Sequence, residues 1–229
     1  MDEDGGATSQ LDLFRADLEK YYRLHFGSSS PPLRKRAALW VSHLGLHCVA
    51  AHRLARQARS TAARRRWAAP ALLGLARVVE HGMELVHHVR ISAEVGPGFY
   101  IGHAGMIFIG PTRIGRNFSV THGVTIGVGQ AVGAKGTPVV GDDVWVGTGS
   151  VLAGAIEVGD GATVVTGSVV TRAVPRSALV AGNPARVVML GYDNADLLGG
   201  SGSTRWRGAP APEPAAPPAV EQAGRRGVG

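Results

Sequence analysis

The segment VGDDVWVGTGSVLAGAIEVGDGATVVTGSVV, residues 140–170, decides the fold, because every sixth residue in it is aliphatic. This period suits a short flat strand followed by a turn, with the aliphatic side chain pointing inward and glycine allowing the turn. A fixed period also indicates units that stack on one another and bury a continuous core. A coiled coil is excluded, since its period is about 3.5 residues. The anchors of this series are Val140, Val146, Leu152, Val158, Val164 and Val170.

The same period occurs earlier in the chain, and two insertions interrupt it. One extra residue lies between Ile107 and Ile114, and eight extra residues lie between Ile126 and Val140. Because the stacking must continue, the extra residues should be extruded as loops, and loops on a rigid scaffold often carry functional sites. A tolerated surface bulge is the alternative interpretation of the longer insertion. The earlier anchors are Val95, Ile101, Ile107, Ile114, Val120 and Ile126.

The segments on either side of the repeats have a different character. Apolar residues at helical spacing predict amphipathic helices before the repeats. After Trp206 the sequence is rich in Pro and Ala without apolar periodicity, which is typical of disorder. We therefore expect an α-helical domain in residues 1–90, a β domain in residues 91–190 and a largely disordered C-terminal extension in residues 191–229. The expected helices span residues 11–26, 33–58 and 67–88.

Composition limits the choice of partners. The formal charge of +7 comes mostly from arginine, but neither interleaved aromatic residues nor a nucleic-acid-binding motif accompanies it. We therefore expect a solvated basic helical face and no nucleic-acid partner. Residues 37–51 are apolar but contain His43 and His47, so a buried helix is expected there and no membrane span. A single cysteine, Cys48, and the absence of a secretory signal favour a cytoplasmic protein.

Two histidines fall at related positions of the repeats. His103 follows Ile101 by two residues, and His122 follows Val120 by two residues. These anchors are three hexads and one inserted residue apart. If three hexads make one coil, both imidazoles lie at one corner on adjacent coils, about 4.8 Å apart along the stack.

Several motifs of the repeat region resemble those of the hexapeptide-repeat acyltransferases, and most closely those of the bacterial serine O-acetyltransferases. The motifs are IGHAG, IGRN, VTHGVTIG, VGDDVWVGTGS, IEVGDGATV, GSVVTRAVP and AGNPARVV, within residues 89–190. The resemblance implies a left-handed parallel β-helix with three hexads per coil, preceded by a helical domain. It also implies a homotrimer or a dimer of trimers, with acetyl-CoA in the grooves between neighbouring subunits.

The implied chemistry is direct acetyl transfer from acetyl-CoA to a hydroxyl, most closely that of L-serine in cysteine biosynthesis. An alcohol needs a base during attack, and a neutral imidazole with a pKa of about 6.5 suits this role. The resemblance assigns that role to His103. His122 is a second catalytic candidate, with a turn residue as the alternative. We expect no metal, because a metal site of this kind would need three convergent imidazoles and only two are found.

The resemblance also implies a set of binding residues. Glycine-rich turns of the later coils and basic side chains near the phosphates would contact the coenzyme. The candidate coenzyme-binding residues are Lys135, Gly147, Thr148, Gly167, Ser168 and Arg186. The candidate acceptor-binding residues are Gly102 and Thr137.

Three positions depart from the family pattern. Gly102 occupies the position of an Asp that commonly meets the ammonium group of the acceptor in the family. Thr137 occupies the position of a His that precedes a Pro, and His88 occupies the position of an Asp that orients the catalytic ring. These departures keep a sugar, a polysaccharide or another hydroxylated metabolite open as the acceptor. A non-catalytic assembly subunit is a further alternative. The chain ends in RRGVG and not in the isoleucine by which serine acetyltransferases bind cysteine synthase, so we do not expect docking by that route.

Overall fold

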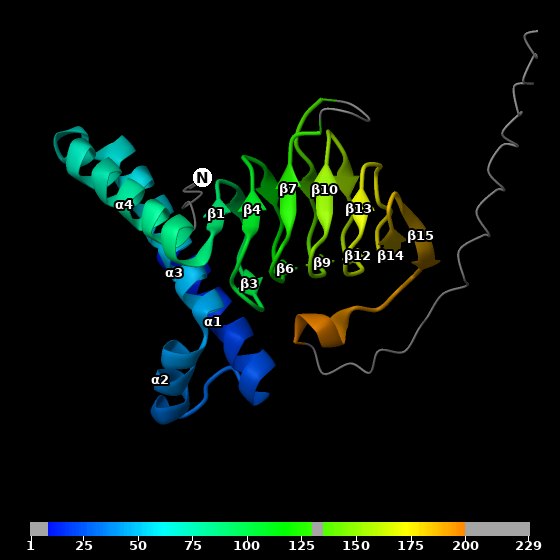
Figure 1. The fold of residues 1–229 in the computed structure, drawn as a ribbon. Helices are drawn as coiled ribbons and strands as arrows, with labels where there is room; N and C mark the ends of the chain where they lie inside the picture. Colours follow the sequence, from blue (N-terminus) through cyan, green and yellow to red (C-terminus); the bar gives the residue numbers. More distant parts are fainter. Residues whose placement is uncertain (1–8, 130–134, 200–229) are drawn as a thin grey trace, which may run out of the picture.

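The structure is a computed structural model that describes residues 9–129 and 135–199. In these ranges, helices stand at one end of a column of short strands (Figure 1). The expected disordered tail falls largely on residues 200–229, outside the described residues, and the short 3-10 helix η2 (Ala195–Leu198) lies just ahead of them. The other helices are α1 (Gln10–Phe26), α2 (Leu33–Ser42), α3 (Leu44–Arg64), the 3-10 helix η1 (Arg66–Ala68) and α4 (Ala69–His87).

The strands form three sheets, which are the three sides of a solenoid. The sheets have the orders β1-β4-β7-β10-β13, β11-β8-β5-β2 and β15-β14-β12-β9-β6-β3. All pairs are parallel except the last, in which β15 runs antiparallel to β14. The first sheet contains β1 (Val89–Ile91), β4 (Ile107–Ile109), β7 (Thr125–Gly127), β10 (Val151–Ala153) and β13 (Val169–Val170). The second contains β2 (Glu94–Val95), β5 (Arg113–Ile114), β8 (Val139–Val140) and β11 (Glu157–Val158). The third contains β3 (Tyr100–Ile101), β6 (Ser119–Val120), β9 (Trp145–Val146), β12 (Thr163–Val164), β14 (Ala178–Gly182) and β15 (Ala185–Leu190).

The strand register confirms three hexads per coil. Val146 pairs with Val164, three hexads further along the chain. Ile101 pairs with Val120 and Val120 with Val146, so both insertions are accommodated without breaking the stack. All four of these anchors are completely buried, and they form one column of the core. The six-residue period therefore specifies both the strands and their stacking.

One corner of the solenoid turns through left-handed backbone conformations. Asn117 and Asp143 both have φ of 57° there, in a region where Asn and Asp are more readily accommodated than most residues. The side-chain amide of Asn117 donates a hydrogen bond of 2.7 Å to the carboxylate of Asp143 on the next coil. Neighbouring coils are thus joined at this corner by side chains as well as by strands.

The middle helix is interrupted, so the expected single helix over residues 33–58 is wrong. His43 separates α2 from α3 and has an extended backbone, with φ of −112° and ψ of 92°. The break brings the start of α3 against strand β3, where a Cβ atom at Gly45 would lie 2.1 Å from the carbonyl oxygen of Ile101. This contact joins residues that are far apart in the sequence, and helical periodicity alone does not predict it.

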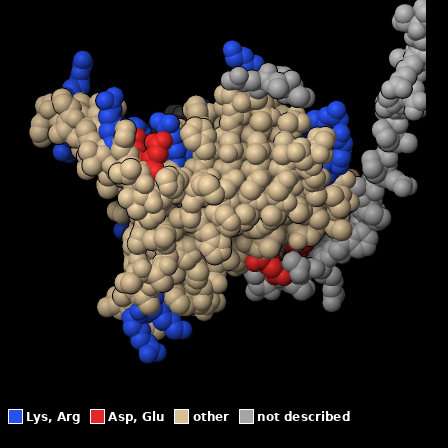
Figure 2. All heavy atoms as spheres, in the orientation of Figure 1, with Lys and Arg blue, Asp and Glu red and all other residues tan. Residues whose placement is uncertain are grey.

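Charged side chains are distributed unevenly over the surface. On the face shown in Figure 2, Lys and Arg lie on the helical end, at the top of the column and at its opposite end, while the central area over β7 and β10 is free of charged side chains. Within the described residues, none of the helices combines the length and the hydropathy that crossing a bilayer requires.

Candidate active site

The two histidines singled out by the repeat pattern lie side by side. His103 follows β3 and His122 follows β6, and the pairing of these strands places them at one corner on adjacent coils. Their ring centroids are 5.9 Å apart, with an interplanar angle of 70°. Both side chains are exposed, and neither imidazole forms a hydrogen bond with the described residues. Two titratable groups therefore face solvent together at this corner.

A pocket of about 370 Å³ opens beside His103. One wall is the strand β3 with the turn that follows it, and the other wall comes from the end of α1 and the junction between α2 and α3. Tyr100 and His25 meet across it, with the tyrosine hydroxyl 3.4 Å from Nε2 of the imidazole. The lining residues are His25, Ser42, His43, Leu44, Gly45, Tyr100, Gly102, His103 and Ala104.

The pocket is lined by polar and apolar groups in similar measure, and it carries no carboxylate among these lining residues. Burial, reinforced by the nearby His25 and His103, lowers the pKa of His43 to about 4. Burial also lowers the pKa of His25. Both rings are therefore neutral at neutral pH, and a neutral imidazole offers one hydrogen-bond donor and one acceptor.

Gly102 lies in the wall of this pocket, directly before His103. A Cβ atom there would meet Thr121 Cγ2 and Tyr100 Cε1, each at 3.4 Å. Both distances are ordinary van der Waals contacts, so the position accepts a Cβ atom in the present arrangement. The other acceptor-binding candidate, Thr137, is half-buried and belongs to the end of the long insertion, which returns beside its start through a bridge between Gly129 and Gly136.

Two coenzyme candidates continue the corner that the histidines begin. The register of β6 and β9 places Thr148 next to His122 on the following coil. Its hydroxyl donates a 3.0 Å hydrogen bond to that of Thr121. Gly147 is buried against the next coil, where an added Cβ would lie 2.6 Å from the amide nitrogen of Thr166. The position thus requires glycine for close stacking of the coils.

Gly167 and Ser168 continue this corner on the next coil, where the amide of Gly167 donates a 2.8 Å hydrogen bond to the carbonyl of Thr148, whereas the two cations lie elsewhere. Gly167 is exposed in a turn, whereas Ser168 is buried and its hydroxyl donates a 2.5 Å hydrogen bond to the carbonyl of Val165. That hydroxyl already has a structural partner inside the coil. Arg186 is exposed on β15, and Lys135 is exposed at the edge of the insertion, next to residues 130–134, which lie outside the described residues. Both cations are accessible to an anion.

Sequence reasoning missed the wall of the pocket that the helices provide. His25, Ser42 and Tyr100 were not candidates, and His43 figured only as an interruption of an apolar stretch. These residues carry no motif. His25, Ser42 and His43 approach His103 only because the helices dock on the first coil, whereas Tyr100 lies on β3, three residues before His103. In the described ranges, no group of three or more His, Cys, Asp or Glu side chains is arranged to hold a metal ion.

Comparison with known proteins identifies the family. Residues 137–172 match the family model described as bacterial transferase hexapeptide (six repeats). The chain is 35% identical over 147 residues to the serine acetyltransferase of Mycobacterium tuberculosis, a match that covers 63% of this chain and 60% of the relative. It is also 35% identical over 160 residues to the serine acetyltransferase of Bacillus licheniformis, covering 69% of this chain and 71% of the relative. The chain belongs to the serine acetyltransferase family.

Solved structures of this family have the same architecture. The serine acetyltransferase of Brucella abortus in complex with coenzyme A aligns with a TM-score of 0.62 and 26% identity, over 77% of this chain and 66% of that one. The hexapeptide repeats of the family indicate a left-handed β-helix, so the expected fold class is confirmed. The match spans less than two thirds of the Mycobacterium tuberculosis serine acetyltransferase, 60% of its length.

Proposed function

We propose that the protein is an acetyl-CoA-dependent O-acetyltransferase whose acceptor is L-serine, a reaction that feeds cysteine biosynthesis. The observation that carries the proposal is the pair of imidazoles at one corner, with ring centroids 5.9 Å apart. Support also comes from the relatives, which are serine acetyltransferases, and from the related structure that contains coenzyme A.

In the proposed reaction His103 is the general base. The acceptor hydroxyl and acetyl-CoA bind together, and His103 removes the hydroxyl proton as the oxygen attacks the thioester carbonyl. Collapse of the tetrahedral intermediate breaks the C–S bond, and the protonated imidazole returns its proton to the departing thiolate. Backbone N–H groups of the glycine-rich turns are the proposed oxyanion donors. His122, whose ring lies beside that of His103, is proposed to stabilise the positive charge that forms on the imidazole of His103.

The proposed coenzyme site extends from this corner along the later coils. Gly147, Thr148 and Gly167 would contribute backbone and hydroxyl contacts, and Ser168 would contribute its backbone, since its hydroxyl is used inside the coil. Lys135 and Arg186 are proposed to meet the phosphate groups. The acceptor would lie between Gly102 on one side and the helical domain, residues 1–90, on the other. Thr137 lies at a different corner of the solenoid, before β8, and would approach the acceptor from a neighbouring subunit.

A second candidate acceptor is a sugar, a polysaccharide or another hydroxylated metabolite. The observation that favours it is the composition of the pocket beside His103, whose lining residues include no carboxylate to pair with an ammonium group. Neutral imidazoles, Ser42 and Tyr100 are instead the groups that bind hydroxyls. Release of free thiol from acetyl-CoA, measured with serine, homoserine and a panel of sugars, separates the two candidates. Turnover with sugars alone would exclude serine.

The catalytic assignment has its own test. Replacing His103 with Ala should lower turnover by about 10² to 10⁴, because the general base is lost. His81→Ala, at an exposed position on α4, is the matched control and should retain full activity. An unchanged rate in the His103 variant would remove this residue from the mechanism, and His122→Ala would then identify the alternative base. If the wild-type protein is inactive with every acceptor, a non-catalytic assembly subunit is the better description of its function.

The proposed assembly is a homotrimer or a dimer of trimers in the cytoplasm. The support for a trimer is the uncharged area over β7 and β10 in Figure 2 and the neighbouring Phe108 on β4, which is 45% exposed beside the guanidinium of Arg90. An uncharged face with exposed apolar groups is typical of a surface that another subunit covers. Sedimentation analysis of the purified protein measures the mass of the assembly.

A further inference from the structure

Strand β3 lies at the open edge of the third sheet. The amides of Tyr100 and Gly102 donate to the carbonyls of Phe118 and Val120 on the next coil. Because successive peptide groups of a strand alternate in direction, the N–H and C=O of Ile101 point the other way, toward the helices. Buried backbone groups at such an edge need partners from elsewhere.

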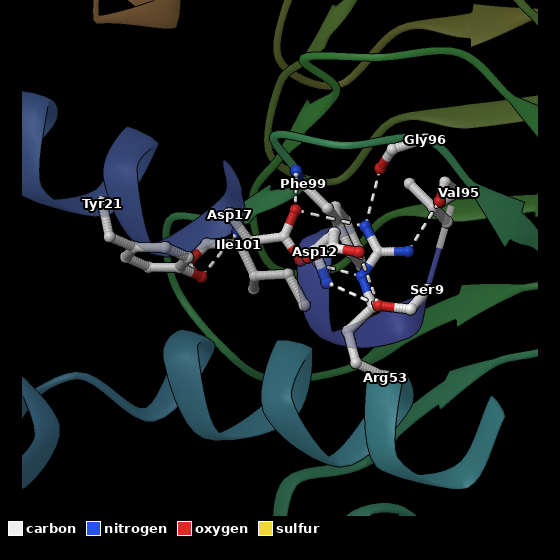
Figure 3. A network of polar contacts seen from close by, with 9 residues as sticks. All are labelled: Ser9, Asp12, Asp17, Tyr21, Arg53, Val95, Gly96, Phe99 and Ile101. Atoms are coloured by element: carbon white, nitrogen blue, oxygen red, sulfur yellow. Dashed lines mark hydrogen bonds and ion pairs between the residues drawn. The ribbon is translucent and has the colours of Figure 1, made fainter. Parts of the chain in front are cut away.

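One side chain of α1 provides both partners. The hydroxyl of Tyr21 accepts a hydrogen bond of 3.0 Å from the N–H of Ile101 and donates one of 3.2 Å to its C=O (Figure 3). Tyr21 is completely buried, and burial raises the pKa of its hydroxyl well above the usual value, so the proton stays in place. The hydroxyl thus takes the place of a neighbouring strand.

Helix α3 closes on the same peptide group. A Cβ atom at Gly45 would lie 2.1 Å from the carbonyl oxygen of Ile101 and 3.0 Å from its carbonyl carbon. A distance of 2.1 Å to a backbone atom is far inside van der Waals contact, so only glycine fits here. Ile101 is therefore held by α1 through a side chain and confined by α3 through its backbone.

The peptide held in this way directly precedes the catalytic turn. His103 is two residues beyond Ile101, and its exposed imidazole has no hydrogen-bond partner among the described residues. Its one ring contact in that part of the chain is with His122. The position of the imidazole consequently depends on the backbone that carries it.

We propose that Tyr21 is a positioning residue for His103 and that Gly45 helps to position the same imidazole. This inference rests on the proposed role of His103 as general base. The helices act on catalysis by fixing Ile101, and through it the turn that presents the imidazole to the acceptor. A displacement of about 1 Å in a reacting group can lower a rate by about 10²-fold.

The test compares neighbouring tyrosines of the same helix. Tyr21→Phe keeps the ring and removes the hydroxyl. Tyr22→Phe is the matched control, because Tyr22 is also buried and its hydroxyl forms no hydrogen bond with the described residues. In Tyr21→Phe we expect kcat to fall by about 10- to 100-fold while KM for acetyl-CoA changes by less than about twofold. Tyr22→Phe should behave as the wild type.

A pair of glycines provides an independent test. Gly45→Ala introduces the Cβ atom that clashes with Ile101, whereas Gly74→Ala, on α4, has nothing within 4 Å of the added atom. Gly45→Ala should lower kcat, and Gly74→Ala should not. Combining Gly45→Ala with Tyr21→Phe should lower kcat by less than the product of the two separate effects, because both act through one peptide group.

A readout independent of turnover separates positioning from general destabilisation. NMR signals of the ring of His103 in histidine-labelled folded protein, assigned with His103→Ala, should shift in Tyr21→Phe and stay in place in Tyr22→Phe. Unchanged ring signals of His103 in Tyr21→Phe, or an unchanged kcat of this variant, would overturn the proposal. The same holds if Tyr21→Phe lowers only the stability of the protein. If the wild type is inactive with every acceptor, the proposed function fails, and the ring signals still decide whether Tyr21 positions His103.

Discussion

Lys20 is buried completely between α1 and the solenoid, although lysine is rarely found in a protein core. Its Nζ donates hydrogen bonds of 2.8 Å to the carbonyl of Asn117 and 3.3 Å to that of Phe118. Burial lowers the pKa of this amine to about 7, against the opposing attraction of Asp143 and Asp17. A single residue thus makes the attachment of α1 to the second coil dependent on pH.

This residue predicts how stability changes above neutral pH. Between the folded pKa of about 7 and the ordinary value of 10.5, the unfolded chain binds a proton that the folded chain lacks. The free energy of unfolding contributed by Lys20 therefore rises with pH across this window. Urea denaturation at several pH values should show a smaller rise in Lys20→Gln than in the wild type. The exposed Lys35→Gln is the control, and equal slopes in all three proteins would contradict the prediction.

At the scale of elements, a buried ion pair attaches the helices to the first coil. Arg53 of α3 pairs with Asp17 of α1 at 2.8 Å, and it donates to the carbonyls of Val95 and Gly96 at 2.7 and 2.6 Å (Figure 3). Asp17 in turn accepts a 2.7 Å hydrogen bond from the amide of Phe99. Burial raises the pKa of Asp17, and Arg53 opposes that shift. The pair therefore satisfies backbone groups that the open end of the solenoid would leave unpaired.

Removing one member of this pair should destabilise the whole attachment. Arg53→Met leaves the buried carboxylate of Asp17 without its cation, and the expected loss is about 3–5 kcal/mol of unfolding free energy. Arg15→Met removes the cation from the exposed pair with Asp12 and is the matched control, for which little change is expected. Both variants are measured by urea denaturation against the wild type. Equal free energies of unfolding of Arg53→Met and Arg15→Met would show that the buried pair contributes no more to stability than the exposed pair.

At the scale of the molecule, the solenoid is a stack in which each coil contacts mainly its neighbours. The helices cover one end of this stack, and the antiparallel hairpin of β14 and β15 closes the other (Figure 1). Core side chains run through its middle without interruption, with Leu152 completely buried in the strand between β7 and β13. Stability should consequently depend on the anchors of the middle coils.

The anchors predict the effect of a cavity in the middle of the stack. Leu152→Ala should lower the free energy of unfolding by about 2–5 kcal/mol, because the rigid coils cannot close around the space. Leu190→Ala, at a position that is 41% exposed on β15, is the chemically identical control and should cost far less. Thermal and urea unfolding measure both. A loss in Leu152→Ala no larger than that in Leu190→Ala would mean that the column of anchors does not carry the stability.

The sequence by itself determined the solenoid and the meeting of its two histidines. The six-residue period acts between neighbouring coils, so the spacing of anchors such as Ile101 and Val120 fixes the register, and the register places His103 beside His122. No long-range information is needed for this, because every coil repeats the same local rule. The resemblance of the motifs then supplied the family, and the comparisons confirmed it.

The tertiary structure alone decided how the helices meet that solenoid. Tyr21 reaches Ile101 across 80 residues of sequence, and Lys20 reaches Asn117 across 97, and neither contact follows from a period. In the docked arrangement the predicted helix is interrupted at His43, and His25 lies in the pocket beside His103. Helical periodicity indicates which side of a helix is apolar. The surface against which that side packs depends on complementary shape between parts of the chain that are far apart in the sequence. For that reason the pocket beside His103 and its support became visible only in the folded chain.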